Sequence, residues 1–92
     1  MDPAAHHVAV TVSNLDRAVE FYRETLGLDV LSEFSVGGDA FATGVGIEGA
    51  SAEFVHMDAG NIRIELVEYD PKGESAAETD LNQPGGTHLG LE

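Results

Sequence analysis

The 92-residue chain contains no cysteine, which excludes disulfide bonds, thiolate metal sites and a cysteine nucleophile. Basic residues are scarce: four Lys and Arg stand against 17 Asp and Glu, giving a formal net charge of −13. Such a surface repels the phosphates of nucleic acids and anionic membranes, so neither is expected as a partner. The sequence also lacks a charged leader and any long apolar run, and we therefore expect a cytoplasmic protein.

The acidic residues are spread along the chain instead of forming a tail, which indicates a property of the whole surface. Lys72 is the only lysine. These features favour a halophilic protein, because a Debye length of roughly 3 Å near 1 M salt screens the repulsion between like charges. An acidic protein from an ordinary cytoplasm is the alternative. The hydrophobic fraction of 42% is sufficient for one modest core.

The first 28 residues predict a strand followed by a helix. Residues 6–12 alternate between valines and other side chains, which is typical of a strand with one apolar face. Ser13 is the expected N-cap of a helix over residues 14–26, and Gly27 is expected to end that helix in the left-handed conformation. The valines and the apolar stripe of the helix can bury each other, which leaves His7 on the opposite face.

The remaining sequence predicts strands at residues 29–36, 51–57 and 61–69, the last two joined as a hairpin. Residues 40–50 contain three glycines and are expected to form an irregular loop. The fold class is therefore α+β, with a βαβββ module over residues 1–70. A polar linker is predicted at residues 71–86. Residues 87–92 resemble the first strand and are expected to begin a second module, with the rest of it absent from this chain.

Three residues share one property: His7, Glu65 and His88 each lie opposite the apolar face of their predicted strand. Two imidazoles and a carboxylate that converge on one cavity can hold a divalent metal and leave coordination positions open. A single histidine on a strand is more commonly a surface residue or a hydrogen-bonded core residue. The spacing alone therefore does not decide whether these residues form a metal site. His6 and His56 are not included in the predicted ligand set.

Three segments, HHVAVTVSNLDRAVEFYRETLGL, NIRIELVEY and GGTHLGLE, together are similar to the vicinal oxygen chelate superfamily. That superfamily includes glyoxalase I, methylmalonyl-CoA epimerase, extradiol dioxygenases and the bleomycin- and fosfomycin-resistance proteins. The resemblance implies paired βαβββ modules that curl into a cup around a metal. By position, His7 and Glu65 match ligands from the first and fourth strands, and His88 matches the first strand of the second module. The fourth ligand has no counterpart.

The resemblance also implies a function: a metal-dependent enzyme of the glyoxalase, lyase or isomerase type that acts on a small molecule with neighbouring oxygens. Ni, Co, Zn, Mn or Fe would stabilise an enolate, and Glu65 would be both a ligand and the catalytic base. A non-catalytic, bleomycin-resistance-like binding protein and an Fe(II) extradiol dioxygenase are the alternatives. Because one module leaves a concave sheet face open, we expect a homodimer.

Overall fold

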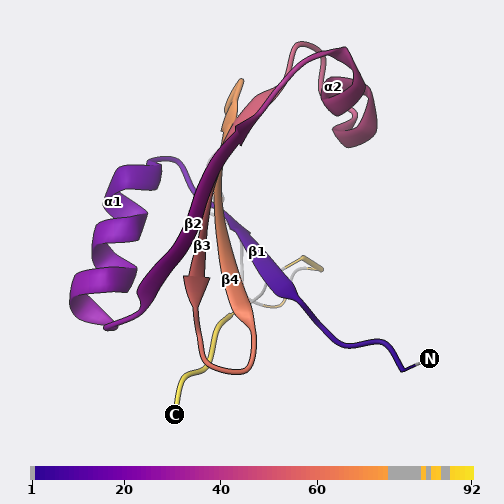
Figure 1. Ribbon diagram of the computed structural model, residues 1–92. Helices are drawn as coiled ribbons and strands as arrows, with labels where there is room; N and C mark the ends of the chain where they lie inside the picture. Colours follow the sequence, from indigo (N-terminus) through magenta and orange to yellow (C-terminus); the bar gives the residue numbers. More distant parts are fainter. Residues whose placement is uncertain (1, 75–81, 83, 86–87) are drawn as a thin grey trace.

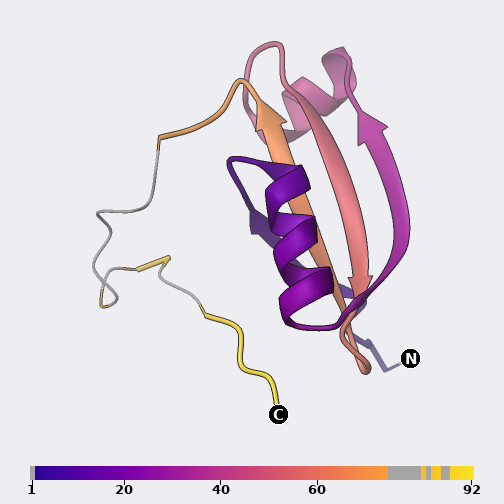
Figure 2. The ribbon, with the colours of Figure 1, turned by 90° about the vertical axis from the view of Figure 1, so that its left-hand side faces the viewer.

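The computed structural model describes residues 2–74, 82, 84–85 and 88–92. Its elements follow the order β1 (His7–Thr11), α1 (Leu15–Glu20), a π-helical continuation η1 (Phe21–Thr25), β2 (Asp29–Val36), α2 (Asp39–Val45), β3 (Ser51–Asp58) and β4 (Arg63–Asp70). The strands form one sheet in the order β1-β4-β3-β2. α1 covers one face of this sheet, whereas α2 lies beyond one end of it (Figures 1 and 2). The chain thus has the predicted α+β fold of a βαβββ module.

The hydrophobic core lies between the sheet and α1. Its buried residues come from the inward-facing positions of β3 and β4 and from the first residue of α1: Leu15, Val55, Met57, Ile64 and Leu66. Val10 and Val12 of the first segment pack against this cluster, as the alternation predicted, whereas Val8 is exposed. No helix among the described residues is long and apolar enough to cross a membrane.

The start of α1 differs by one residue from the prediction. Asn14, not Ser13, is the N-cap, and its side-chain oxygen accepts a hydrogen bond from the backbone N–H of Arg17 at 3.1 Å. The N–H of Leu15 is bound at 2.7 Å by the Glu68 carboxylate of β4, so a distant residue takes part in capping. The predicted end is confirmed, because Gly27 adopts a positive φ of 74°.

The prediction of an irregular loop over residues 40–50 is wrong for its first half, where α2 forms. Asp39 lies in the first turn of α2, and Gly46 ends the helix in the left-handed conformation with φ 73°. Gly44 is inside the helix, where a glycine costs about 1 kcal/mol relative to alanine but does not prevent helix formation.

The predicted hairpin is confirmed: β3 and β4 pair in antiparallel fashion from Ser51 opposite Asp70 to Asp58 opposite Arg63. At its turn, the Asp58 side chain accepts a hydrogen bond from the N–H of Gly60 at 2.7 Å. β1 pairs in parallel with β4, along the edge of β4 that faces away from β3.

Residues 88–92 have no regular structure, and residue 87 lies outside the described residues, so the strand predicted at 87–92 is not observed. A strand requires a hydrogen-bonded neighbour, and no described strand pairs with residues 88–92.

Candidate metal centre

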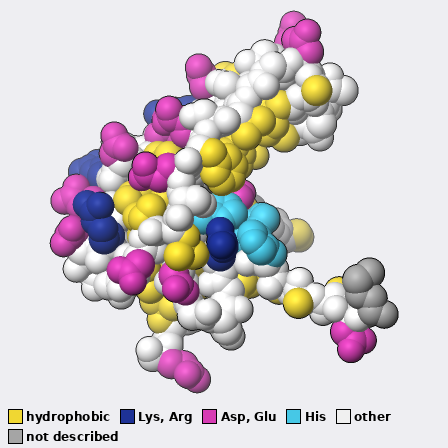
Figure 3. Space-filling model, in the orientation of Figure 1, with side chains coloured by type: hydrophobic (Ala, Val, Ile, Leu, Met, Phe, Trp, Pro, Cys, Tyr) yellow, Lys and Arg dark blue, Asp and Glu magenta, His cyan; other side chains and the backbone are white. Residues whose placement is uncertain are grey.

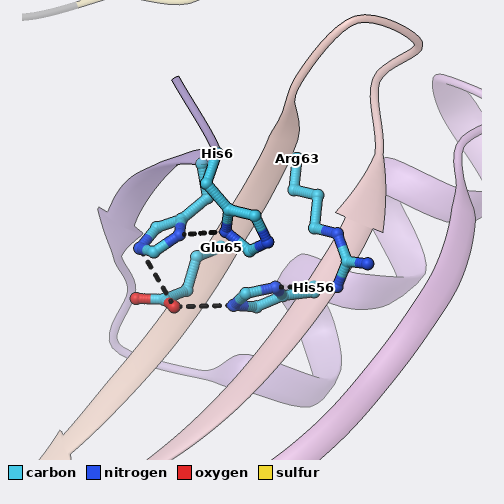
Figure 4. A network of polar contacts seen from close by, with 5 residues as sticks. His6, His56, Arg63 and Glu65 are labelled. Carbon is cyan, nitrogen blue, oxygen red and sulfur yellow. Dashed lines mark hydrogen bonds and ion pairs between the residues drawn. The ribbon is translucent and has the colours of Figure 1, made fainter. Parts of the chain in front are cut away.

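The strand registers bring three potential metal ligands together on the face of the sheet opposite α1. His56 of β3 lies directly opposite Glu65 of β4, and Glu65 pairs in turn with Ala9 of β1. His7 is two positions before Ala9 on the same face of β1, so it is a diagonal neighbour of Glu65. One ligand atom from each of His7, His56 and Glu65 lies within 4.8 Å of the others (Figure 4).

The Glu65 carboxylate is the centre of the contacts. Its Oε2 atom is 2.7 Å from Nε2 of His56 and 3.5 Å from Nε2 of His7. Figure 4 shows both contacts converging on one carboxylate oxygen, with the Arg63 side chain beyond His56. Nη1 of Arg63 is 3.4 Å from Nδ1 of His56, and the Nδ1 atoms of His6 and His7 are 2.8 Å apart.

Burial differs between the members of this group. The side chains of His56 and Glu65 are 7% and 12% exposed, whereas that of His7 is 40% exposed. A buried carboxylate is costly unless hydrogen bonds or opposite charges compensate for the lost water. Within the described part of the chain, every buried side-chain nitrogen and oxygen has a hydrogen-bond partner. The group is therefore anchored in the sheet on one side and open to solvent on the other.

The donor set suits a divalent transition metal. Imidazole nitrogens and a carboxylate oxygen bind Zn, Ni, Co, Mn and Fe(II) ions, with bond lengths of about 2.0–2.2 Å for Zn. Two such donors on a tetrahedral ion lie about 3.4 Å apart, close to the 3.5 Å between Nε2 of His7 and Oε2 of Glu65. The half-exposed side of the group leaves room for further ligands or for substrate.

Two of the three predicted ligands, His7 and Glu65, lie together in this group. His88 is exposed and is not a member of it among the described residues. His56 is the member that the sequence analysis did not select. The hairpin register would have indicated it, because a connection running from Asp58 to Arg63 places position 56 opposite position 65.

A row of aromatic side chains continues from the histidines along the same face. Phe34 contacts the His56 ring edge-on at a centroid distance of 5.4 Å and stacks on Phe54 at 4.9 Å. Phe41 of α2 extends the row by packing against both Phe54 and Tyr69. Figure 3 shows the histidines gathered beside an apolar strip, while acidic side chains are spread over the rest of the visible surface. Phe34 is 43% exposed, so this strip is accessible.

Comparisons with known proteins identify the family and agree with the fold. The family model of the Glyoxalase/Bleomycin resistance protein/Dioxygenase superfamily matches residues 4–92. A 2-epi-5-epi-valiolone epimerase from Actinomyces sp is 30% identical to this chain. The alignment covers 96% of this chain and 50% of that protein. The crystal structure of a glyoxalase family protein from Bacillus cereus matches with a TM-score of 0.72 at 25% identity, over 87% of this chain and 56% of that one. The chain thus spans about half the length of these relatives.

Proposed function

Because this chain belongs to the Glyoxalase/Bleomycin resistance protein/Dioxygenase superfamily, we propose that it forms half of the active site of a divalent-metal-dependent isomerase or lyase. The observation that carries the proposal is the convergence of His7 and Glu65, from strands at opposite ends of the module sequence, on one partly open point. The similarity to an epimerase supports the isomerase class.

His7 and Glu65 would hold the metal from this module, and His88 would supply a third ligand from the segment that follows. The support for His88 is the resemblance of residues 87–92 to the first strand of a second module, together with the family match that extends to residue 92. The remaining ligand would come from a second module or from a partner chain. A homodimer is one way to complete the cup over the open sheet face.

The proposed reaction begins with removal of a proton from the carbon beside a substrate carbonyl. A metal bound here would hold two neighbouring substrate oxygens and stabilise the negative charge of the resulting enolate. Glu65 would accept the proton through its carboxylate, and return of the proton to the other face or to the adjacent carbon would give the epimer or the isomer. Glu65 and His56 are themselves buried in the sheet, which excludes water from one side of this site.

Metal content and thermal stability test this proposal. We expect the purified protein to bind about one divalent ion per site and to melt at a higher temperature with Ni, Co, Zn or Mn, since a ligand at about 100 times its Kd stabilises the folded state by about 2.7 kcal/mol. His7→Ala should remove both effects, whereas Glu53→Gln, on the same sheet but exposed, should keep them. No bound metal in the wild type and a melting temperature unmoved by all four ions would contradict the proposal.

The reaction class can be tested without the natural substrate. A panel of α-hydroxyketones and hemithioacetals is incubated with the metal-loaded protein in D₂O. Metal-dependent deuterium incorporation at the carbon beside the carbonyl is the expected result, and it should disappear in Glu65→Gln. Oxygen consumption with a catechol and Fe(II) would instead indicate the dioxygenase reaction.

A second candidate function is the binding of an apolar or aromatic small molecule without catalysis. The exposed Phe34 and the aromatic row behind it support this alternative, and the net charge of −13 would favour a cationic ligand. The two functions differ in their response to His7→Ala. Turnover would be lost in an enzyme, whereas a binding protein would keep its affinity.

A further inference from the structure

We infer that His56 is a positioning residue for Glu65 and is not itself a metal ligand. This inference rests on the proposed function and divides the group of three donors into two ligands, His7 and Glu65, and one support. Proximity alone does not make the division, since all three donor atoms lie within 4.8 Å of one another. The individual distances between the donor atoms and their hydrogen-bonding roles separate the two ligands from the support.

The distance between His56 and Glu65 fits a hydrogen bond better than a pair of donors on one ion. Nε2 of His56 is 2.7 Å from Oε2 of Glu65. That value lies within the range of about 2.7–2.9 Å for hydrogen bonds to a charged partner. Two donors with bonds of about 2.1 Å to the same ion are about 3.0 Å apart at a right angle and further apart in a tetrahedral site. The contact of His7 with the same oxygen, at 3.5 Å, fits the tetrahedral spacing.

The Arg63 side chain determines which nitrogen of His56 carries the proton. An arginine guanidinium only donates hydrogen bonds, so Nδ1 of His56, 3.4 Å from Nη1 of Arg63, is the acceptor. In the neutral ring the proton is then on Nε2, the atom that faces the Glu65 carboxylate (Figure 4). Both nitrogens of His56 are therefore engaged, and neither offers a free lone pair to a metal.

Packing holds His56 in this orientation. The residue is 5% exposed, and its ring lies against those of Phe34 and His7 at centroid distances of 5.4 and 5.2 Å. A hydrogen bond from a fixed donor restricts the rotation of the Glu65 carboxylate and holds it ready for a metal, which is the usual role of residues behind a ligating carboxylate. This assignment leaves the third coordination position to a residue outside the group, the place predicted for His88.

Histidine NMR of the wild-type protein tests the inference directly. Two-bond ¹H–¹⁵N correlation spectra identify the protonated ring nitrogen, and they are recorded before and after addition of Zn²⁺. We expect His56 to carry its proton on Nε2 in both states, while the ring nitrogens of His7 shift on Zn²⁺ addition. Protonation of His56 on Nδ1, or loss of its Nε2 proton when Zn²⁺ binds, would overturn the inference.

Variants give a second readout through Zn²⁺ affinity measured by calorimetry. Glutamine places a side-chain N–H the same number of bonds from Cα as Nε2 of histidine, whereas leucine has no donor. We expect His56→Gln to keep the affinity within about threefold and His56→Leu to lose about 10–100-fold, the usual effect of removing such a support. Equal and complete loss of binding in His56→Gln and His7→Ala would identify His56 as a ligand and overturn the inference.

Failure of the proposed function and failure of this inference give different experimental results. If the wild type does not bind Zn²⁺, the metal-dependent function is contradicted. The metal-free spectrum then still decides whether Nε2 of His56 donates to Glu65.

Discussion

Glu68 connects the sheet to the helix that covers it, and its removal gives a prediction whose size follows from the contacts. Its Oε1 atom accepts a hydrogen bond of 2.7 Å from the N–H of Leu15, 53 residues earlier in the chain. Leu15 is the first residue of α1, so this N–H is one of the donors that a helix cannot satisfy internally. The carboxylate also lies at the positive end of the helix dipole.

Replacing Glu68 with alanine has two opposing effects on the free energy of unfolding. Loss of a hydrogen bond to a charged group costs about 1.5–3 kcal/mol. Glu53 of β3 lies directly opposite Glu68, and relief of this repulsion between like charges returns about 0.2–1 kcal/mol. The net loss is then about 0.5–3 kcal/mol, and each kcal/mol lowers the melting temperature of a domain of this size by about 4–8 °C.

Thermal and urea unfolding followed by circular dichroism measure this loss. Glu68→Gln retains an uncharged acceptor and should lie between Glu68→Ala and the wild type. Glu53→Ala is the matched control, since it removes the same repulsion from an exposed position without touching the cap. If Glu68→Ala proves as stable as Glu53→Ala, the contact with Leu15 does not stabilise the protein and the reasoning is refuted.

Three further predictions concern the core, the charge and the assembly. Leu66→Ala, at a fully buried position, should cost about 2–5 kcal/mol in urea unfolding, whereas Leu31→Ala, at a position 45% exposed, should cost far less, and equal losses would refute the assignment of the core. The net charge of −13 predicts a melting temperature that rises between 0.1 M and molar KCl as repulsion is screened, and a flat profile would count against a halophilic surface. The open sheet face predicts a dimer in light scattering, and a stable monomer would contradict it.

The fold was accessible from the sequence because it depends on short-range patterns. Alternation assigned the two faces of β4, with Ile64 and Leu66 inward and Glu65 outward, and the structure agrees. The family resemblance is confirmed by the match over residues 4–92. In contrast, Ser13 and Asn14 are equally good caps, and the choice between them involves contacts that local sequence does not contain, such as the distant Glu68 carboxylate.

The candidate site was only partly accessible for a related reason. The faces of single strands identify His7 and Glu65, but the position of His56 relative to them depends on the register of the hairpin. Register follows from the conformation of the turn at Asp58 and Gly60, which composition does not specify. The Arg63 contact that determines the role of His56 depends on side-chain packing, which neither the strand pattern nor the register specifies.

The position of β1 at the edge of the sheet has a consequence for the order in which the molecule opens. Among the described strands, β1 is hydrogen-bonded to β4 alone. Its detachment would carry His7 away while the hairpin that holds Glu65 and His56 stays intact, so the site can be dismantled by a local opening far smaller than global unfolding. A metal held between His7 and Glu65 would oppose this opening by linking the two strands. Metal binding should therefore slow amide hydrogen exchange in β1 more strongly than at the centre of β3.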